Sequence, residues 1–298
     1  MAITASVSFL SPSPSRLFCL QNHNPLSQPL FSLPFHSHAF LTFASPQKRL
    51  KPTAIPKNIT PSAQASNDSA PMLPPYNVLI TGSTKGIGFA LAREFLKAGD
   101  NVIISSRSVM QINNAGSNAY SYKPLAEASD EDLIEVVTTN TLGLMICCRE
   151  AIKMMLNQPQ GGHIFNIDGA GSDGRPTPRF AAYGATKRSV VHLTKSLQAE
   201  LQMQDVKNVV VHNLSPGMVT TDLLMSGATT KQAKFFINVL AEPAEVVAEY
   251  LVPNIRSIPV NGSTKPTYIR FLTGLKAYSQ IFSRFAFGAR RNRYLLED

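Results

Sequence analysis

Acidic residues are missing from the first 67 positions of this 298-residue chain. The stretch from Met1 to Asn67 is rich in Ser, Pro, Phe and Leu, and its formal charges are all basic. An acid-free, hydroxyl-rich leader of this kind is typical of an organellar transit peptide, and the composition favours a plastid address over secretion. We therefore expect residues 1–65 to be a transit peptide. A disordered tail rich in Pro and Ser is the alternative.

Cysteines are also few. Of the three in the chain, Cys19 lies in the leader, and Cys147 and Cys148 are neighbours on an expected helix, where adjacent side chains point apart. A disulfide framework is therefore excluded, and the six histidines lack ligand spacing, so we expect no metal site.

No long apolar run marks a membrane span. The apolar stretch near the N-terminus is interrupted by prolines and falls short of the roughly 20 residues that cross a bilayer. The formal charge of +9 is partly a property of the leader. No motif that reads RNA or DNA accompanies that charge, so we expect no nucleic-acid partner.

The sequence does contain a strand, a glycine turn and a helix, in the stretch YNVLITGSTKGIGFALAREFLKAGD. The apolar run from Val78 to Ile80 suits a buried parallel strand. Glycines let the backbone approach a pyrophosphate closely, and the N-terminus of the next helix adds N–H groups and a positive dipole. A glycine turn alone can be merely a tight turn, but the flanking strand and helix favour a dinucleotide site. The candidate cofactor residues here are Gly82, Ser83, Lys85, Gly86, Ile87 and Gly88.

The second expected strand, Asn101 to Ser106, ends without an acid. An acid at this place normally holds the ribose 2′-hydroxyl of NAD. Arg107 is the nearest charge, and Lys85 in the glycine turn is a second cation. Two cations without a carboxylate suit a 2′-phosphate, which favours NADPH over NADH. The alternative is that both are solvated surface charges.

Tyr183 and Lys187 are four residues apart on an expected long helix, so both side chains project from one face. A phenol titrates near about pH 10 and donates a proton poorly at neutral pH. A nearby ammonium stabilises the phenolate and lowers the pKa of the phenol. Tyr183 could then protonate a carbonyl oxygen as hydride reaches the carbon. The spacing alone, however, occurs often by chance.

In combination the motifs are specific, because TGSTKGIG, NNAG, NTLG, YGATK and SPGMVTTD occur in this order between Tyr76 and Tyr250. This set resembles the short-chain dehydrogenase/reductases, a family with a Rossmann-type, doubly wound parallel α/β sheet, and residues 76–250 are expected to form its catalytic domain. The resemblance implies that Tyr183 is the acid/base, that Lys187 also holds the nicotinamide ribose, and that Asn140 supports a proton-relay water. It further implies cofactor contacts from Asn114, Ala115, Gly116, Pro216, Gly217, Val219 and Thr221.

One position departs from the family. A substrate-polarising Ser usually lies at the strand end before the Tyr, but here that end reads NIDGAGSDGRPTP. Asp168, Gly169 or Ala170 fills the place, and Ser172 is the nearest hydroxyl. Ser172 could act from a re-routed loop or be an ordinary turn residue, and both readings stay open.

The stretch NIDGAGSDGRPTPRFAAYGATKRS, the leader and the basic aromatic tail are similar to the plastid chlorophyll(ide) b reductases. That resemblance implies reduction of the 7-formyl group of chlorophyll(ide) b to hydroxymethyl, the first step of chlorophyll b degradation. It places the protein in the chloroplast, at the stromal face of the thylakoid membrane. Another hydrophobic carbonyl substrate is the alternative.

Residues 251–298 form an expected basic, amphipathic C-terminal extension. An apolar residue recurs there every three or four positions, which predicts one helical stripe made of Tyr268, Phe271, Leu275, Tyr278, Phe282 and Phe285. A basic amphipathic helix suits a lipid surface, such as a peripheral contact with thylakoid membrane, or a flat hydrophobic substrate. A terminal helix packed on its own domain is the alternative.

Only SVMQI separates Arg107 from Asn113, where the family has a helix, a third strand and a further helix. A parallel crossover needs a dozen residues or more. We therefore expect an incomplete sheet, in which the second strand and the NNAG strand cannot both hold their usual places.

Such a chain would be a shortened product with weak or no activity, unless it is a natural minimal member of the family. It could instead dimerise with the full-length reductase. The helices around Asp130–Leu156 and Tyr183–Gln202, which form the dimer interface in this family, are retained.

Overall fold

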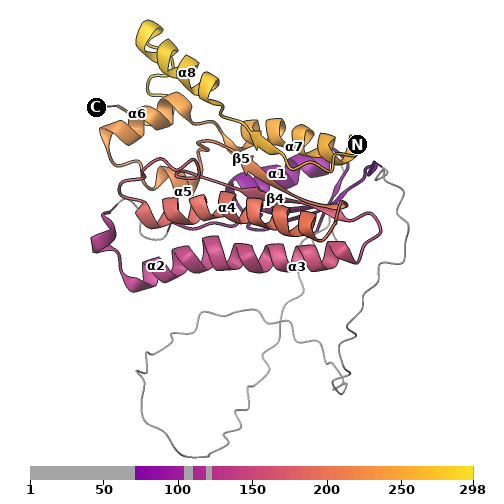
Figure 1. Ribbon diagram of the computed structural model, residues 1–298. Coiled ribbons are helices and arrows are strands. Elements are labelled where there is room, and N and C mark those ends of the chain that lie inside the picture. The colour runs from indigo at the N-terminus through magenta and orange to yellow at the C-terminus, as the bar shows by residue number, and fades with distance from the viewer. Residues whose placement is uncertain (1–70, 104–109, 119–122, 298) are drawn as a thin grey trace, which may run out of the picture. The chain divides into compact units, whose positions relative to one another are not determined.

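A parallel sheet of six strands forms the centre of the computed structural model (Figure 1), which describes residues 71–103, 110–118 and 123–297. These residues all belong to one unit, Ser62–Asp298. The strand order is β2-β1-β3-β4-β5-β6, and every pairing is parallel. The strands are β1 Asn77–Ile80, β2 Asn101–Ile103, β3 Met110–Asn113, β4 Gly162–Ile167, β5 Val209–Ser215 and β6 Tyr268–Arg270. The order reverses at β1, which is the switch point of a doubly wound, Rossmann-type fold, so the expected fold class is confirmed.

Helices cover both faces of this sheet (Figure 1). On one face α1 (Gly86–Lys97) packs against α7 (Ala244–Val260). On the other lie α2 (Asp130–Val137), α3 (Leu144–Leu156) and α4 (Ala181–Met203). The 3-10 turn Leu125–Glu127 precedes α2, and a π-helical turn, η2 (Thr138–Gly143), joins α2 to α3. The remaining helices are α5 (Asp222–Met225), α6 (Lys231–Leu240) and α8 (Gly274–Phe287).

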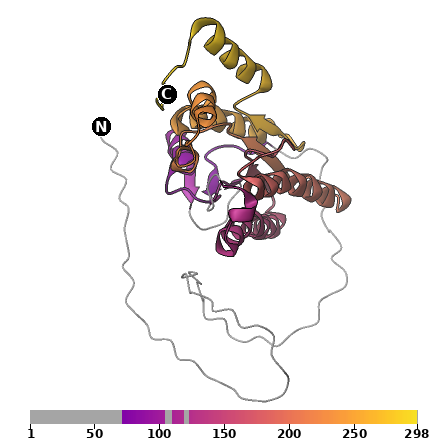
Figure 2. The same cartoon turned by 90° about the vertical axis from the view of Figure 1, so that its left-hand side faces the viewer.

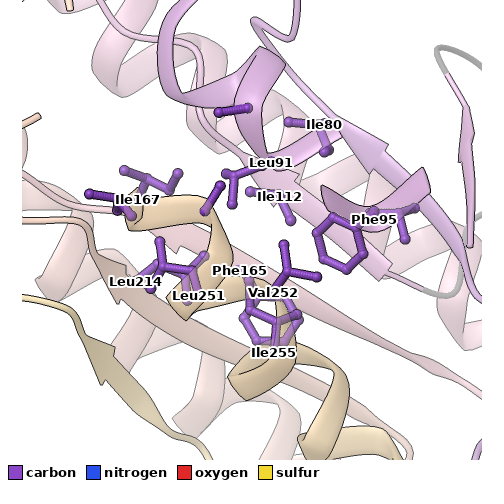
Figure 3. Close-up of a cluster of buried hydrophobic side chains, with 14 of the residues drawn as sticks. Ile80, Leu91, Phe95, Ile112, Phe165, Ile167, Leu214, Leu251, Val252 and Ile255 are labelled. Carbon is purple, nitrogen blue, oxygen red and sulfur yellow. The ribbon is translucent and has the colours of Figure 1, made fainter. Parts of the chain in front are cut away.

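The main core lies between the sheet and the α1–α7 pair (Figure 3). Leu91 and Phe95 of α1 and Leu251 and Ile255 of α7 are fully buried against the strands. Strands β3, β4 and β5 are buried almost throughout, as expected for parallel strands covered on both faces. This burial fixes the carboxyl ends of the strands, where the candidate site is built.

Side-chain caps explain where several helices begin. Ser129 accepts a hydrogen bond from the Asp132 N–H at the start of α2, whose first turn is acidic and so complements the helix dipole. Thr273 caps α8 in the same way, and Gly288 ends that helix in the left-handed region.

The expectation that β2 and β3 cannot both hold their places is wrong, because both pair with β1. The β2 strand has only three residues, and Met110 lies opposite Val78 at the level of Val102. From the end of β2 to the start of β3 the chain must therefore cross two strand spacings, roughly 10 Å. Along the strand direction it must return by only about one residue. The seven Cα steps from Ile103 to Met110 reach roughly 24 Å. The error came from applying the usual crossover of a dozen residues or more to a strand as short as β2.

The six residues between β2 and β3, Arg107 among them, lie outside the described residues, and so does the expected transit peptide. The expected loss of a third strand and two flanking helices concerns this segment, so it too lies outside the described residues. In the part of the chain that the structure describes, β2 is an edge strand. On the neighbouring β1, Val78 and Ile80 are buried towards the core, whereas Leu79 between them is only half-buried.

The prediction of one apolar stripe from Tyr268 to Phe285 is also wrong. Tyr268 belongs to β6, and Phe271 is buried in the main core before α8 begins at Gly274. Helix α7 runs across position 250, so residues after it contribute to the domain core. The spacing failed as a guide because a strand and a helix in succession can imitate a continuous helical period.

Helix α8 contacts α6 and projects from the rest of the domain (Figure 2). It keeps an apolar face in solvent. Leu275, Tyr278, Phe282 and Phe285 are between 66% and 83% exposed. None of the helices in the described ranges is long and apolar enough to cross a membrane.

Candidate active site

Lys187 lies at the centre of the candidate site, where α4 passes the carboxyl end of β4. Its side chain is buried, and its Nζ donates a hydrogen bond of 3.2 Å to the carbonyl of Ile167. Nζ is 5.7 Å from the centre of the Tyr183 ring. Burial lowers the pKa of Lys187 to about 8, and the charge of Asp168 opposes this shift. A lysine that titrates close to neutrality can both hold and release a proton.

The hydroxyl of Tyr183 lies over Gly169, just beyond β4. A Cβ added to Gly169 would lie 2.6 Å from that hydroxyl and 3.1 Å from Cγ of Lys187. The structure therefore brings Tyr183 and Lys187 together, and the absence of a side chain at Gly169 leaves them room.

Asn140 is a third buried member of this group. Its carboxamide accepts from Ser117 N at 2.8 Å and donates to Ser117 O at 2.8 Å and to Thr186 Oγ1 at 3.1 Å. A Cβ on Gly116 would lie 3.5 Å from Asn140 Oδ1 and 3.6 Å from Lys187 Nζ, so these three residues converge. Asn140 sits in the π-helical turn η2, and such turns are frequent at functional sites.

The glycine turn between β1 and α1 adopts a conformation that only glycine fits. Gly82 and Gly86 have φ angles of 64° and 58°, and a Cβ on Gly88 would lie 2.4 Å from the Gly82 carbonyl. Asn114 fastens this turn to the end of β3, because its Nδ2 donates to the carbonyls of Thr81 and Gly82, both at 3.1 Å.

Thr81 was missed by the sequence analysis. Its Oγ1 accepts hydrogen bonds from the backbone of Asn114 at 3.0 Å and of Ala115 at 3.1 Å. Its place directly before Gly82, at the end of an expected strand, is a sequence signal that could have identified it.

A dinucleotide fits this turn, because it is a glycine cradle that an added Cβ would fill, placed at the start of α1. Ile87 packs beside the core, and Ser83 is half-buried in the turn. Lys85 is exposed and lies 3.9 Å from Asp222, so its charge is shared with an acid. Arg107, the other cation assigned to a 2′-phosphate, lies outside the described residues.

The segment after β5 closes the other side of the turn. A Cβ on Gly86 would lie 3.2 Å from Cγ2 of Thr221. Pro216 and Val219 are buried, and Gly217 has a φ of 72° and packs tightly on Leu272. Thr221 therefore lies close enough to the turn to touch the same ligand.

The strand end that departs from the family carries a buried cluster. Asp168 is 4% exposed, and its Oδ2 accepts hydrogen bonds from Ser172 Oγ at 3.1 Å and from the Tyr268 hydroxyl. Burial raises the pKa of Asp168, while Tyr268, Ser215, Ser172 and Lys187 act against the shift. Burial and Asp168 raise the pKa of Tyr268 to about 12. The hydroxyl hydrogen of Ser172 is therefore donated to Asp168.

Tyr268 was also missed as part of the site, because it was counted in the apolar stripe. No local pattern links it to Asp168, 100 residues earlier in the chain. Within the described ranges no three His, Cys, Asp or Glu side chains are grouped to hold a metal ion.

The geometry joins a glycine turn on a Rossmann-type sheet to a Tyr–Lys–Asn group, which defines an NAD(P)H-dependent oxidoreductase. The chain belongs to the short-chain dehydrogenase/reductase family: the family described as short chain dehydrogenase matches residues 109–232. It is 70% identical over 292 positions to "Chlorophyll(ide) b reductase NOL, chloroplastic" of Arabidopsis thaliana, covering 83% of this chain and 84% of that protein. It is 71% identical to the protein of the same name in Oryza sativa subsp. japonica, covering 77% of this chain and 80% of that protein.

Solved structures show the same fold at low identity. "ElxO with NADP Bound" superposes with a TM-score of 0.53 at 24% identity, over 66% of this chain and 98% of that chain. "The Closed form of serine dehydrogenase complexed with NADP+" gives a TM-score of 0.55 at 23% identity, over 66% of this chain and 94% of that chain.

The alignments also contain a gap in this chain. The alignment with the Arabidopsis relative has 292 positions, but 83% of 298 residues is about 247, so about 45 positions have no residue of this chain. The rice alignment, with 276 positions and 77% coverage, has about the same shortfall. The family match begins at residue 109, immediately before β3.

Proposed function

We propose that this protein carries out the NADPH-dependent reduction of the 7-formyl group of chlorophyll(ide) b to hydroxymethyl, the first step of chlorophyll b degradation. The observation that carries the proposal is the convergence of Tyr183, Lys187 and Asn140. They converge in a chain 70% identical to a protein named as a chlorophyll(ide) b reductase. The relatives' names also say chloroplastic, and the acid-free leader agrees with that address.

The chain's own residues would manage the proton. When bound, the nicotinamide cofactor supplies the hydride that the formyl carbon accepts. Tyr183 gives its hydroxyl proton to the formyl oxygen, and the ammonium of Lys187 stabilises the phenolate that remains. Lys187, whose pKa is lowered to about 8 by burial, then returns a proton to Tyr183 and recovers one from solvent. Asn140 holds the loop at Ser117 and the helix at Thr186 in register around this path.

Cofactor contacts would come from the glycine turn and the loops around it. Gly82, Gly86 and Gly88 would face the pyrophosphate, with Asn114 bracing the turn. Lys187 would also hold the nicotinamide ribose, and Thr221 would lie beside the nicotinamide. The preference for NADPH rests on Lys85, Arg107 and the missing acid after β2.

Pigment reduction in a purified system tests the proposal. The 298-residue chain, incubated with NADPH and chlorophyllide b, should form the 7-hydroxymethyl product, which chromatography detects. NADH should support a lower rate. Tyr183→Phe should lower the rate by at least about a hundredfold, since one general acid contributes that much or more. Tyr250→Phe, on the exposed side of α7, is the matched control. Equal turnover by wild type and Tyr183→Phe would overturn the assignment.

A second candidate is a shortened isoform that pairs with the full-length reductase. The roughly 45-position gap supports it, and so does an apolar face along α2, η2 and α3. On that face Ile134 is 64% exposed and Leu142 is 51% exposed, with Met145 and Ile146 beside them. Patches of this kind are typical of subunit contacts.

A variant that carries, between β2 and β3, the residues that the Arabidopsis relative has and this chain lacks distinguishes the two. If the insertion raises turnover at least about tenfold, and the present chain co-purifies with the inserted version, the pairing role stands. Equal turnover of both chains without co-purification excludes it. A change of Ile134 to Glu should abolish co-purification without altering the turnover of the active chain.

Peripheral contact with thylakoid lipid is part of the same proposal, because α8 presents five exposed large apolar side chains and belongs to a basic segment. Flotation with pigment-free anionic liposomes tests it. Wild type should float with the vesicles, and a Phe282→Ser, Phe285→Ser variant should stay in the soluble fraction. Wild type that stays soluble counts against the contact.

A further inference from the structure

Asp168 is a buried carboxylate that the proposed chemistry leaves without a task. It directly follows β4, is 4% exposed, and receives two hydrogen bonds on one oxygen, from Ser172 and Tyr268. Burying a carboxylate costs free energy unless hydrogen bonds or an opposite charge compensate. The compensation here is assembled from three separate elements: the β4–α4 loop, β6 and, through Ser215, the end of β5.

The carboxylate is also the charge that acts on Lys187. The Nζ of Lys187 donates to the carbonyl of Ile167, the residue before Asp168, so the ammonium lies at the same strand end as Asp168. A neutral carbonyl does not offset the burial of an ammonium as an opposite charge does. In the described part of the chain, Asp168 is the group that raises the pKa of Lys187 against its burial.

We propose that Asp168 is a positioning residue for the reduction: its carboxylate, oriented by Tyr268 and Ser172, keeps Lys187 charged so that Tyr183 can give up its proton. The inference rests on the proposed function for its kinetic consequence, but the underlying contacts do not depend on the substrate. The proposal also gives the C-terminal segment a role in the site, because Tyr268 of β6 supplies the hydroxyl that orients the Asp168 carboxylate.

The charged and titratable groups around Asp168 favour its ionised form. Lys187 faces it from α4, and Tyr268 faces it from β6 with the guanidinium of Arg270 3.9 Å from the centre of the phenol ring. From the β4–α4 loop, Ser172 donates to it while the carbonyl of Ser172 accepts from Arg188 at 2.8 Å. All of the full charges in this set are positive, so they oppose the effect of burial on the carboxylate.

The kinetic test is the pH profile of pigment reduction by the full chain between about pH 6 and about pH 9. Asp168→Asn keeps the shape of the side chain but loses the charge. Its kcat should fall by up to about tenfold above pH 8 and change little near pH 6, because Lys187 loses its proton sooner and the alkaline fall in rate begins about one pH unit lower. KM should change less than about twofold. Asp168→Glu should restore part of kcat, and Tyr268→Phe should shift the profile in the same direction by less.

A purely structural role gives a different result. In that case Asp168→Asn lowers the thermal midpoint while its pH profile coincides with that of wild type, which would overturn the proposal.

A second measurement needs neither pigment nor cofactor. The ultraviolet absorbance of tyrosinate should show one phenol that ionises last in wild type, and Asp168→Asn should move that ionisation down by at least about one pH unit. Unchanged tyrosine ionisation would overturn the pairing of Tyr268 with Asp168 directly. If wild type reduces no pigment but this shift is found, the substrate assignment has failed and the pairing of Tyr268 with Asp168 stands.

Discussion

Two buried histidines on neighbouring strands should make this protein sensitive to acid. His163 on β4 and His212 on β5 are 4% and 0% exposed, and Nδ1 of His163 is 3.0 Å from Nε2 of His212. The backbone N–H of Thr267 donates to Nδ1 of His212 at 3.1 Å. Since that nitrogen accepts, Nε2 of His212 carries the hydrogen and donates to His163. A proton added to either ring would set one N–H against another.

The size of the effect follows from the pKa values. Burial lowers the pKa of His163 to about 4. Burial and the neighbouring His163 lower the pKa of His212 to about 3. In the unfolded chain both titrate near about pH 6.5. Their contribution to stability is therefore complete above that pH and is lost as pH falls towards the folded values. From pH 7 to pH 5 each costs about 2 kcal/mol, so the pair costs about 4 kcal/mol, against a usual total of about 5–15 kcal/mol.

Urea unfolding followed by circular dichroism at several pH values in this range measures the loss. His163→Gln keeps an acceptor near His212 but cannot take up a proton. Between pH 7 and pH 5 the free energy of unfolding of this variant should therefore fall by about 2 kcal/mol less than that of wild type. His192→Gln is the matched control, because it makes the same substitution at a histidine that is exposed on α4. If His163→Gln follows wild type at every pH, the argument from buried neutral rings is refuted.

Two further changes test the cofactor turn and the C-terminal segment. Gly88→Ala places a Cβ 2.4 Å from the Gly82 carbonyl, so NADPH affinity measured by fluorescence should fall at least about tenfold, whereas Gly274→Ala, with open space around it, should bind normally. Glu242→Gln weakens ion pairs of 2.8 Å to Arg290 and 2.7 Å to Arg293, and the partly buried site should lose about 2 kcal/mol in urea unfolding. Unchanged affinity or unchanged stability, respectively, would contradict these expectations.

Much of the fold could be predicted because its signals are local. A short apolar run, a glycine turn and an amphipathic helix follow one another from Val78 to Phe95, and each is written in neighbouring residues. The Tyr183–Lys187 pair is also local, since one helical turn joins them. The parallel sheet was implied by the family resemblance that the ordered motifs carry.

The predictions that failed depend on distances in the folded chain, which a single sequence does not reveal. Whether six residues can join β2 to β3 depends on how short β2 is and on the level at which Met110 pairs, and both are set by tertiary packing. Tyr268 reaches Asp168 through the pairing of β5 with β6, and no spacing in the sequence encodes that pairing. The apolar repeat of the tail was read as one helix because its period does not reveal that a strand comes first.

The short edge strand β2 has a consequence for how long the protein persists in the cell. Within the described ranges no further strand pairs with the outer side of β2, so its backbone amides there lack a neighbour in the sheet. Such a rim is a template on which another polypeptide can add a strand. Chaperones and proteases act on chains that open, so an unpaired rim of this kind would favour their action on this protein.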